Sequence, residues 1–397
     1  MTLTLDYETL AAAAGLLDDT GLRGRLLVAG ADRRRFLQGL LTNDIEALGP
    51  GTGCYAALLT PQGRMTTDLR VSELGDACLL DLPASRAPVV AARLEDSIFT
   101  EDVTIRDATA EQVQFAVHGP RAFEIVSRAL AGAGVEAVPS EAQLAALREY
   151  HHTLLRLAGT PLVVARADDL AVPGLVLYAA REHRSLLWEA LSTAGARPVS
   201  REAAEALRIE AGRPAFGADM DEHTIPLEAG IERRAISFTK GCYVGQEVII
   251  RVLHRGHGRV ARRLVRLDLE TEGPEALPPR GAPLRLDGRE VGRLTSVAWS
   301  PRRGGVALGY VQRDHAVAGS ILWYTEDTDT KRAVSTEKTA GTDTNGGTAP
   351  EPPGGAGPTG RPDGLAADSL AAAAAREGAP RRGRARIRSV IGMEEES

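Results

Sequence analysis

The apolar residues of this chain come in short runs, and the spacing of these runs changes near Val260. Before that point, runs of strand length, such as residues 54–60, alternate with helical patterns, such as the one that follows Ser200. After it, strand-like runs follow one another closely, and Asp287-Gly288 between two of them predicts a type I′ hairpin. This order predicts an α+β fold followed by a small, mostly β domain.

Local turn signals refine the first region. Asp32 is a candidate N-cap for a helix that presents Phe36 and Leu37 on one face. Thr60-Pro-Gln-Gly63 predicts a turn from the strand over 54–60 into a second strand through Leu69 and Val71.

The composition changes again after about residue 327 of the 397. Residues 328–397 contain no aromatic residue and are rich in Gly, Pro, Thr and Ala, so they are predicted to be a disordered tail. The tail carries a basic patch made of Arg381, Arg382, Arg384, Arg386 and Arg388. We expect a solvated tail there; the alternative is a weak electrostatic contact with RNA or another acidic partner.

The net charge, the apolar runs and the cysteines exclude some classes of protein and indicate a cellular compartment. The net charge of -6 argues against a general nucleic-acid binder, because neutralising phosphates takes a surplus of Lys and Arg. No run approaches the roughly 18 apolar residues of a membrane span. The three cysteines, Cys54, Cys78 and Cys242, form no CxxC pair, which is typical of a reducing compartment and predicts a cytoplasmic protein.

The segment Lys240-Gly-Cys-Tyr-Val-Gly-Gln-Glu247 is the most informative for chemistry. Its glycines permit a tight backbone path into a helix that can begin at Glu247. A thiol at a helix entrance, two residues from Lys240, is expected to favour the thiolate form. Cys242, with Lys240 beside it, is therefore a candidate nucleophile, redox centre or soft-metal ligand. The alternative is a small buried cysteine in a Gly-rich turn.

Three acids remain as candidates for binding a flat heterocycle: Asp68, Glu210 and Glu228. A buried carboxylate can accept paired N–H hydrogen bonds from a pterin, although each acid is by default a surface or capping residue. No metal site is predicted, because no four ligands have zinc spacing and His254 with His257 is a single HxxH. No phosphate-binding glycine motif or nucleophile elbow is present.

Several segments together resemble the glycine-cleavage T-protein superfamily, from about Leu26 to about Tyr324. They are residues 31–39, 59–68, 118–120, 207–212 and 219–228. Within that superfamily, residues 240–247 followed by Arg251 resemble the signature of the YgfZ branch, which includes mitochondrial iron–sulfur assembly relatives. The resemblance implies a ring of three domains around a central folate site, the last a small β-barrel. We divide the chain into residues 1–256 (two interleaved α+β domains that bind folate), 257–327 (the barrel) and 328–397 (the tail).

The resemblance also implies a function and a set of site residues. Members of the branch bind tetrahydrofolate and support the assembly or repair of iron–sulfur enzymes, including enzymes that modify tRNA. The implied partners are folate and iron–sulfur client or assembly proteins, with no membrane. Folate contact is implied for Asp68 and Glu228. Around the signature Cys242, the implied site residues are Lys240, Tyr243, Gln246, Glu247 and Arg251.

Departures from the T-proteins leave alternatives open. T-proteins have paired acids where this chain has Thr67-Asp68, and they lack the cysteine signature. The first hypothesis is folate-dependent iron–sulfur maintenance. The second is an enzyme that transfers an aminomethyl or other one-carbon unit, with Asp68 as the acid/base group. The third is a non-catalytic scaffold that holds a partner or RNA through the basic tail. Whether the chain is an enzyme stays open.

Overall fold

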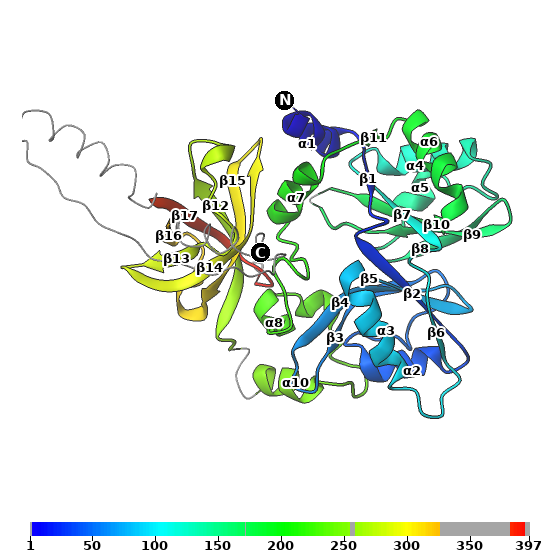
Figure 1. Cartoon of the computed structure of the whole chain (residues 1–397), viewed down its shortest axis with the longest axis horizontal. Coiled ribbons are helices and arrows are strands. Elements are labelled where there is room, and N and C mark those ends of the chain that lie inside the picture. The colour runs from blue at the N-terminus through cyan, green and yellow to red at the C-terminus, as the bar shows by residue number, and fades with distance from the viewer. Residues whose placement is uncertain (1, 171, 255–258, 326–381, 394–397) are drawn as a thin grey trace, which may run out of the picture.

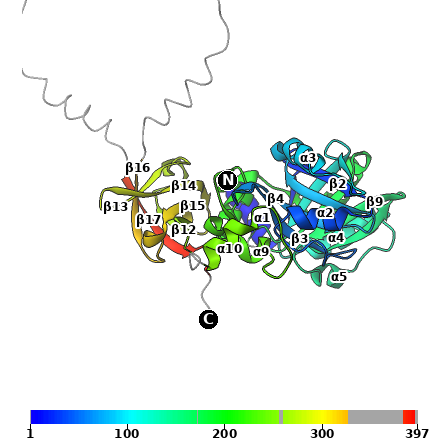
Figure 2. The ribbon, with the colours of Figure 1, turned by 90° about the horizontal axis from the view of Figure 1, so that it is seen from below.

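The computed structural model describes residues 2–170, 172–254, 259–325 and 382–393. Over these ranges the chain forms two open sheets and one closed barrel (Figure 1). The barrel lies at one end of the molecule and the two sheets at the other in both views (Figures 1 and 2). No helix in the described ranges is long and apolar enough to cross a membrane.

The five-stranded sheet is antiparallel, with the order β3-β4-β5-β2-β6. Its strands are β2 (Arg23–Ala29), β3 (Gly53–Leu59), β4 (Met65–Glu73), β5 (Ala77–Pro83) and β6 (Thr104–Asp107). One face packs its apolar side chains against helices α2 (Arg33–Leu40) and α3 (Ala87–Glu95). The strand predicted over 54–60 and its partner through Leu69 and Val71 are confirmed as β3 and β4.

Asp32 does occupy the N-cap position of α2, but its side chain caps nothing. Its carboxylate instead accepts a hydrogen bond of 2.9 Å from the backbone N–H of Asp102. The residue thus ties the start of α2 to the loop before β6.

The six-stranded sheet has the order β11-β1-β7-β10-β9-β8. Its strands are β1 (Gly15–Asp18), β7 (Gln112–His118), β8 (His152–Leu157), β9 (Thr160–Arg166), β10 (Gly174–Ala180) and β11 (Arg197–Pro198). Helices α4 (Ala122–Gly132), α5 (Glu141–Ala145) and α6 (Arg184–Thr193) cover one face. Strand residues alternate between the two faces of a sheet, so each sheet also has a second face, opposite the one that its helices cover. The second faces of the two sheets share a buried layer that includes Leu79, Val163 and Tyr178.

The remaining helices connect the sheets to the barrel. They are α1 (Thr2–Ala12), α7 (Arg201–Glu210), α8 (Pro226–Ala229), α9 (Glu232–Ala235) and α10 (Gln246–His254). Helices α7 and α8 lie between the sheets and the barrel (Figure 1). The link is polar and buried: Arg208 on α7 donates 2.7 Å to Asp219, which in turn accepts 2.7 Å from Ser296 of the barrel.

The barrel closes in the order β12-β15-β14-β13-β16-β17. Its strands are β12 (Arg262–Glu270), β13 (Pro283–Leu286), β14 (Arg289–Ser300), β15 (Gly304–Gln312), β16 (Ile321–Thr325) and β17 (Arg382–Val390). Asp287 and Gly288 have φ of 49° and 80°, so the predicted type I′ hairpin joins β13 to β14. The predicted α+β fold with a C-terminal β-barrel is confirmed.

The prediction of a disordered tail over 328–397 is wrong where β17 lies. Residues 382–390 pair with β12 and β16 and close the barrel. Ala385 and Ile387 point into the barrel core, while Arg384, Arg386 and Arg388 alternate with them on the outside. Only three of the nine residues of β17 are apolar (Ala385, Ile387 and Val390), so the arginines dominate its composition and hide the strand pattern. The rest of the predicted tail, 328–381 and 394–397, lies outside the described residues.

Candidate functional site

Asp68 lies in the middle of β4, on the sheet face that looks away from α2 and α3. It pairs in register with Ala57 of β3, so Tyr55, two residues from Ala57, shares its face. The Tyr55 hydroxyl donates a hydrogen bond of 2.8 Å to Asp68 Oδ2. The other carboxylate oxygen, Oδ1, is buried and has no hydrogen-bond partner among the described residues.

Burial dominates the electrostatics of Asp68. Only 8% of the residue is exposed. Desolvation raises the pKa of its carboxyl group, and Arg23, the Tyr55 hydroxyl and Arg70 oppose that shift without cancelling it. Asp68 is therefore a buried acid with one acceptor atom that the described residues leave unused.

Aromatic and cationic groups gather beside Asp68. The rings of Tyr55 and Tyr150 stack with centroids 5.9 Å apart and an interplanar angle of 18°. The Arg234 guanidinium lies 5.0 Å from the centroid of the Tyr55 ring and donates a hydrogen bond of 3.1 Å to the Tyr150 hydroxyl. We call Asp68, Tyr55, Tyr150 and Arg234 the Asp68 cluster.

A buried ion network adjoins the Asp68 cluster. Arg70 donates to Asp81 Oδ2 at 2.8 Å and also bonds to Asp169, while Arg23 donates to Asp81 Oδ1 at 2.7 Å. Burial opposes ionisation of Asp81, but Arg23 and Arg70 outweigh it and hold the pKa of Asp81 below its ordinary value. The network keeps two guanidinium groups charged close to Asp68.

The other two candidate acids are occupied elsewhere. Glu228, on α8, pairs with Arg262 of β12 at 3.1 Å, and the Arg262 guanidinium lies 4.4 Å from the centroid of the Tyr310 ring. Glu210 accepts from the Tyr7 hydroxyl at 3.0 Å. No hydrogen bond or ion pair between described residues joins Glu228 to Asp68, so the two acids implied for folate contact have different polar partners.

Lys240 holds the signature segment against the end of α2. Its ammonium group donates hydrogen bonds of 2.6, 2.6 and 2.8 Å to the carbonyl oxygens of Gln38, Leu41 and Asn43. The Gln38 carbonyl belongs to the last turn of α2 and those of Leu41 and Asn43 follow it, where the helix has no donors of its own to offer. Burial lowers the pKa of Lys240 to about 8, which the nearby Asp44 opposes. The three donors of the ammonium group are directed to these carbonyls and none to Cys242, so a contribution of Lys240 to the Cys242 thiol stays a prediction.

Two glycines allow the same segment to touch the β3–β4 turn. Gly245 has a φ of +84°, and a Cβ there would lie 2.5 Å from the carbonyl oxygen of Thr60. Gly63, in the turn, has a φ of +73°, and a Cβ there would lie 2.8 Å from the Cβ of Val248. Side chains at these two positions would force the segment and the turn apart.

The remaining signature residues divide into buried and exposed groups. Tyr243 is buried in the core that also contains Tyr55 and Tyr150, and its backbone N–H donates 3.3 Å to the side-chain oxygen of Gln246. Cys242 is exposed, as are Glu247 and Arg251 on α10. The alternative of a buried Cys242 is therefore wrong. The exposed thiol lies between two anchored residues, Lys240 and Tyr243. No hydrogen bond or ion pair of the described residues joins Glu247 or Arg251 to Asp68.

Metal ligands do not gather in the described part of the chain, which holds no group of three or more His, Cys, Asp or Glu residues placed to bind one ion. His257 and the side chain of His254 lie outside that part.

No sequence pattern by itself singles out Tyr55, Tyr150 or Arg234. Tyr55 could have been found from the sequence, because its two-residue spacing from Ala57 puts it on the same sheet face as Asp68 once β3 and β4 are paired. Tyr150 precedes β8 and Arg234 lies on α9. Only the tertiary fold brings them to β3, so no local pattern could have found them.

Comparison with known proteins follows the same division of the chain. Residues 3–240 match the GCVT N-terminal domain, and residues 262–333 match the glycine cleavage T-protein C-terminal barrel domain. The glycine cleavage system aminomethyltransferase T from Bartonella henselae has the same fold, with a TM-score of 0.71 at 23% identity over 81% of this chain and 84% of that one.

Proteins of similar sequence point to the same family as the two domain matches. An aminomethyltransferase of Rubrobacter xylanophilus is 31% identical over 307 residues, which cover 77% of this chain and 78% of the relative. A chloroplastic putative transferase of Arabidopsis thaliana, At1g60990, is 29% identical over 77% of this chain and 67% of its own length. The chain belongs to the glycine cleavage T-protein (GCVT) family.

Proposed function

We propose that this chain binds tetrahydrofolate at the Asp68 cluster. The observation that carries the proposal is the buried, unpartnered Oδ1 of Asp68. A pterin ring offers adjacent N–H donors, and a buried carboxylate is the acceptor they require. Leaving such an acceptor unpaired is costly, so a ligand that donates to it gains affinity and orientation together.

The neighbours of Asp68 suit the same ligand. Tyr55 and Tyr150 offer aromatic surface for a flat ring system, and Arg234 supplies a cation for an anionic group. Tetrahydrofolate, when bound, supplies the one-carbon chemistry, and the chain's own residues bind and orient it. Equilibrium dialysis against tetrahydrofolate under anaerobic, reducing conditions is expected to give one bound equivalent per chain. A value near zero would contradict the proposal.

For the biological role we propose support of iron–sulfur enzymes, as in the YgfZ branch, including enzymes that modify tRNA. Three unpaired cysteines suit the reducing cytoplasm, where we place the protein. The supporting observation is the exposed Cys242, held between Lys240, which is bonded to the end of α2, and the buried Tyr243. Anchors on both sides fix the position of the thiol, as contact with a client or assembly protein requires.

Complementation tests this role. In a strain that lacks the protein, Cys242→Ala is expected to leave iron–sulfur enzyme activity unrestored, while Cys54→Ala in the half-buried β3 position restores it. Full restoration by Cys242→Ala at equal protein level refutes a role for the thiol.

The second candidate function is one-carbon transfer. It is favoured by the aminomethyltransferases among the relatives and by the raised pKa of Asp68, which suits an acid/base group. T-proteins have a pair of acids where this chain has Thr67-Asp68. The Thr67 hydroxyl, in place of the other acid of that pair, donates a hydrogen bond of 2.9 Å to the backbone oxygen of Asp68. Incubation with tetrahydrofolate and a methylamine donor separates the two functions: turnover that Asp68→Asn abolishes would favour the transferase.

A further inference from the structure

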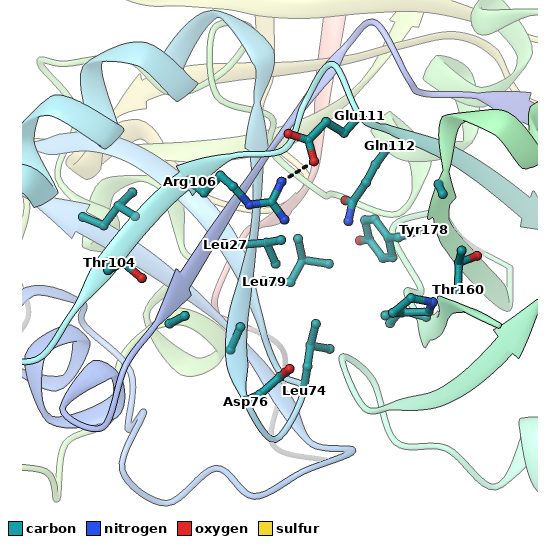
Figure 3. Close-up of a pocket in the computed structure, with 16 residues that line it drawn as sticks. Leu27, Leu74, Asp76, Leu79, Thr104, Arg106, Glu111, Gln112, Thr160 and Tyr178 are labelled. Atoms are coloured by element: carbon teal, nitrogen blue, oxygen red, sulfur yellow. Dashed lines mark hydrogen bonds and ion pairs between the residues drawn. The ribbon is translucent and has the colours of Figure 1, made fainter.

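A groove of about 810 Å³ opens between the two sheets, apart from the Asp68 cluster. Figure 3 shows Leu27 and Leu79 from the five-stranded sheet facing Tyr178 from the six-stranded sheet across this space. None of the four residues of the Asp68 cluster lines it. Its volume lies within the range of roughly 300–1,000 Å³ that small-molecule sites occupy, and such sites favour domain interfaces.

Most polar groups around the groove already have partners. The Tyr178 hydroxyl donates 2.7 Å to Asp81, which leaves the Tyr178 ring to form the wall. Arg106 pairs with Glu111 at the rim, and Thr160 donates 2.9 Å to the carbonyl oxygen of Leu157.

Gln112, at the start of β7, differs from these groups. Its side-chain oxygen is buried and has no hydrogen-bond partner in the described part of the chain. Figure 3 shows its amide directed toward the space between Leu79 and Tyr178. A primary amide presents one acceptor and one donor side by side, whichever way it is flipped. A buried acceptor without a partner is unfavourable, so a ligand that donates to it is selected.

We infer that the groove binds a planar heterocycle that carries a lactam edge, as uracil, thymine, guanine and hypoxanthine do. The lactam N–H donates to the Gln112 side-chain oxygen, and the lactam carbonyl accepts from its NH₂ group. The apolar side chains and the Tyr178 ring contact the faces of the heterocycle. This site is additional to the proposed folate site and needs no residue of the Asp68 cluster.

Uridine and 3-methyluridine are the matched probes, because N-methylation replaces the lactam donor with a methyl group and leaves both carbonyl groups in place. In saturation-transfer NMR titrations of the full chain, uridine is expected to bind with a Kd on the order of 1 mM. Binding of 3-methyluridine is expected to be at least about 10-fold weaker.

Protein variants assign the contact to the groove. Gln112→Leu is expected to weaken uridine binding by about 10-fold or more, while Gln312→Leu, on the exposed end of β15, leaves it unchanged. Ala77→Phe, which projects a ring from the lining, abolishes binding, and thermal unfolding verifies that each variant is folded. Asp68→Asn leaves uridine binding unchanged.

Three outcomes overturn the inference: no binding of uridine to the wild-type chain, equal binding of both probes, or binding that survives both Gln112→Leu and Ala77→Phe. Because tetrahydrofolate also carries a lactam edge, its binding is measured on the same variants. If tetrahydrofolate binding is lost in Asp68→Asn but kept in Gln112→Leu and Ala77→Phe, the folate site is separate from the groove.

Discussion

At the scale of single residues, the burial of Asp68 makes the stability of the fold depend on pH. Its carboxyl group is buried and its pKa is raised above the ordinary value of 3.8 by desolvation. In the pH window between the unfolded and the folded pKa, the folded chain keeps the proton that the unfolded chain has lost. The free energy of unfolding therefore falls as the pH rises through that window.

The neutral isostere tests this balance. Asp68→Asn keeps an oxygen that can accept from Tyr55 and removes the buried charge. We expect the variant to be more stable than the wild type at neutral pH, and to lack the fall in stability above the ordinary Asp pKa. Denaturant unfolding at a series of pH values measures both. If the free energy of unfolding of the two proteins changed with pH in the same way, ionisation of the buried Asp68 would carry no free-energy cost, contrary to this prediction.

The three thiols are predicted to differ in reactivity. Burial raises the pKa of Cys54 to about 12, and burial together with Glu73 raises the pKa of the Cys78 thiol as well. Cys242 is exposed. A thiol-specific chromogenic reagent should titrate one cysteine in the native protein and three after unfolding. The native signal should vanish in Cys242→Ala; its persistence would place a buried thiol within reach of solvent.

At the scale of elements, Lys240 couples the signature segment to α2. Lys240→Met leaves three carbonyl oxygens without their donor, and we expect a loss of about 2 kcal/mol of unfolding free energy. Cys242→Ala, two residues away and exposed, is the control and is expected to change stability by less than about 0.5 kcal/mol. Equal stability of both variants would mean that water replaces the ammonium group.

Strand β17 makes a second prediction at this scale. Thr325 and Arg382 are paired directly across β16 and β17, so a two-residue Asn-Gly turn can join them. Replacing residues 326–381 by Asn-Gly is expected to keep the barrel soluble and its thermal midpoint unchanged. Truncation after residue 381 leaves β12 and β16 without their partner and is expected to cause aggregation. A soluble, folded truncation would show that β17 is dispensable.

The elements also show how far sequence patterns reach. The turn at Thr60–Gly63 and the alternation around it predict β3, β4 and the position of Asp68, because these depend on neighbours in the chain. The segment from Lys240 to Gln246 shows that a recognisable motif does not fix the role of each residue. Lys240 lies beside Cys242 in the sequence yet bonds to the end of α2, a contact that only the tertiary fold creates.

At the scale of the whole molecule, the layer between the second faces of the two sheets has two separate parts. One part is the Asp68 cluster with the ion network of Arg70 and Asp81. The other is the groove, whose Tyr178 wall reaches the same Asp81 through its hydroxyl. The barrel is attached through Arg208 and Asp219 and through the Glu228–Arg262 pair. Glu228 thus helps to hold the barrel in place, and its contact with folate stays a prediction.

Calorimetric titration of tetrahydrofolate into the wild-type chain and into Asp68→Asn tests whether the Asp68 carboxylate binds the pterin, with Asp96→Asn, exposed at the end of α3, as the control. We predict one site per chain in the wild type and the control, and affinity at least about 10-fold weaker in Asp68→Asn, because the ligand loses a charged acceptor. Equal affinity in all three proteins would contradict the claim that the buried Asp68 carboxylate binds the pterin.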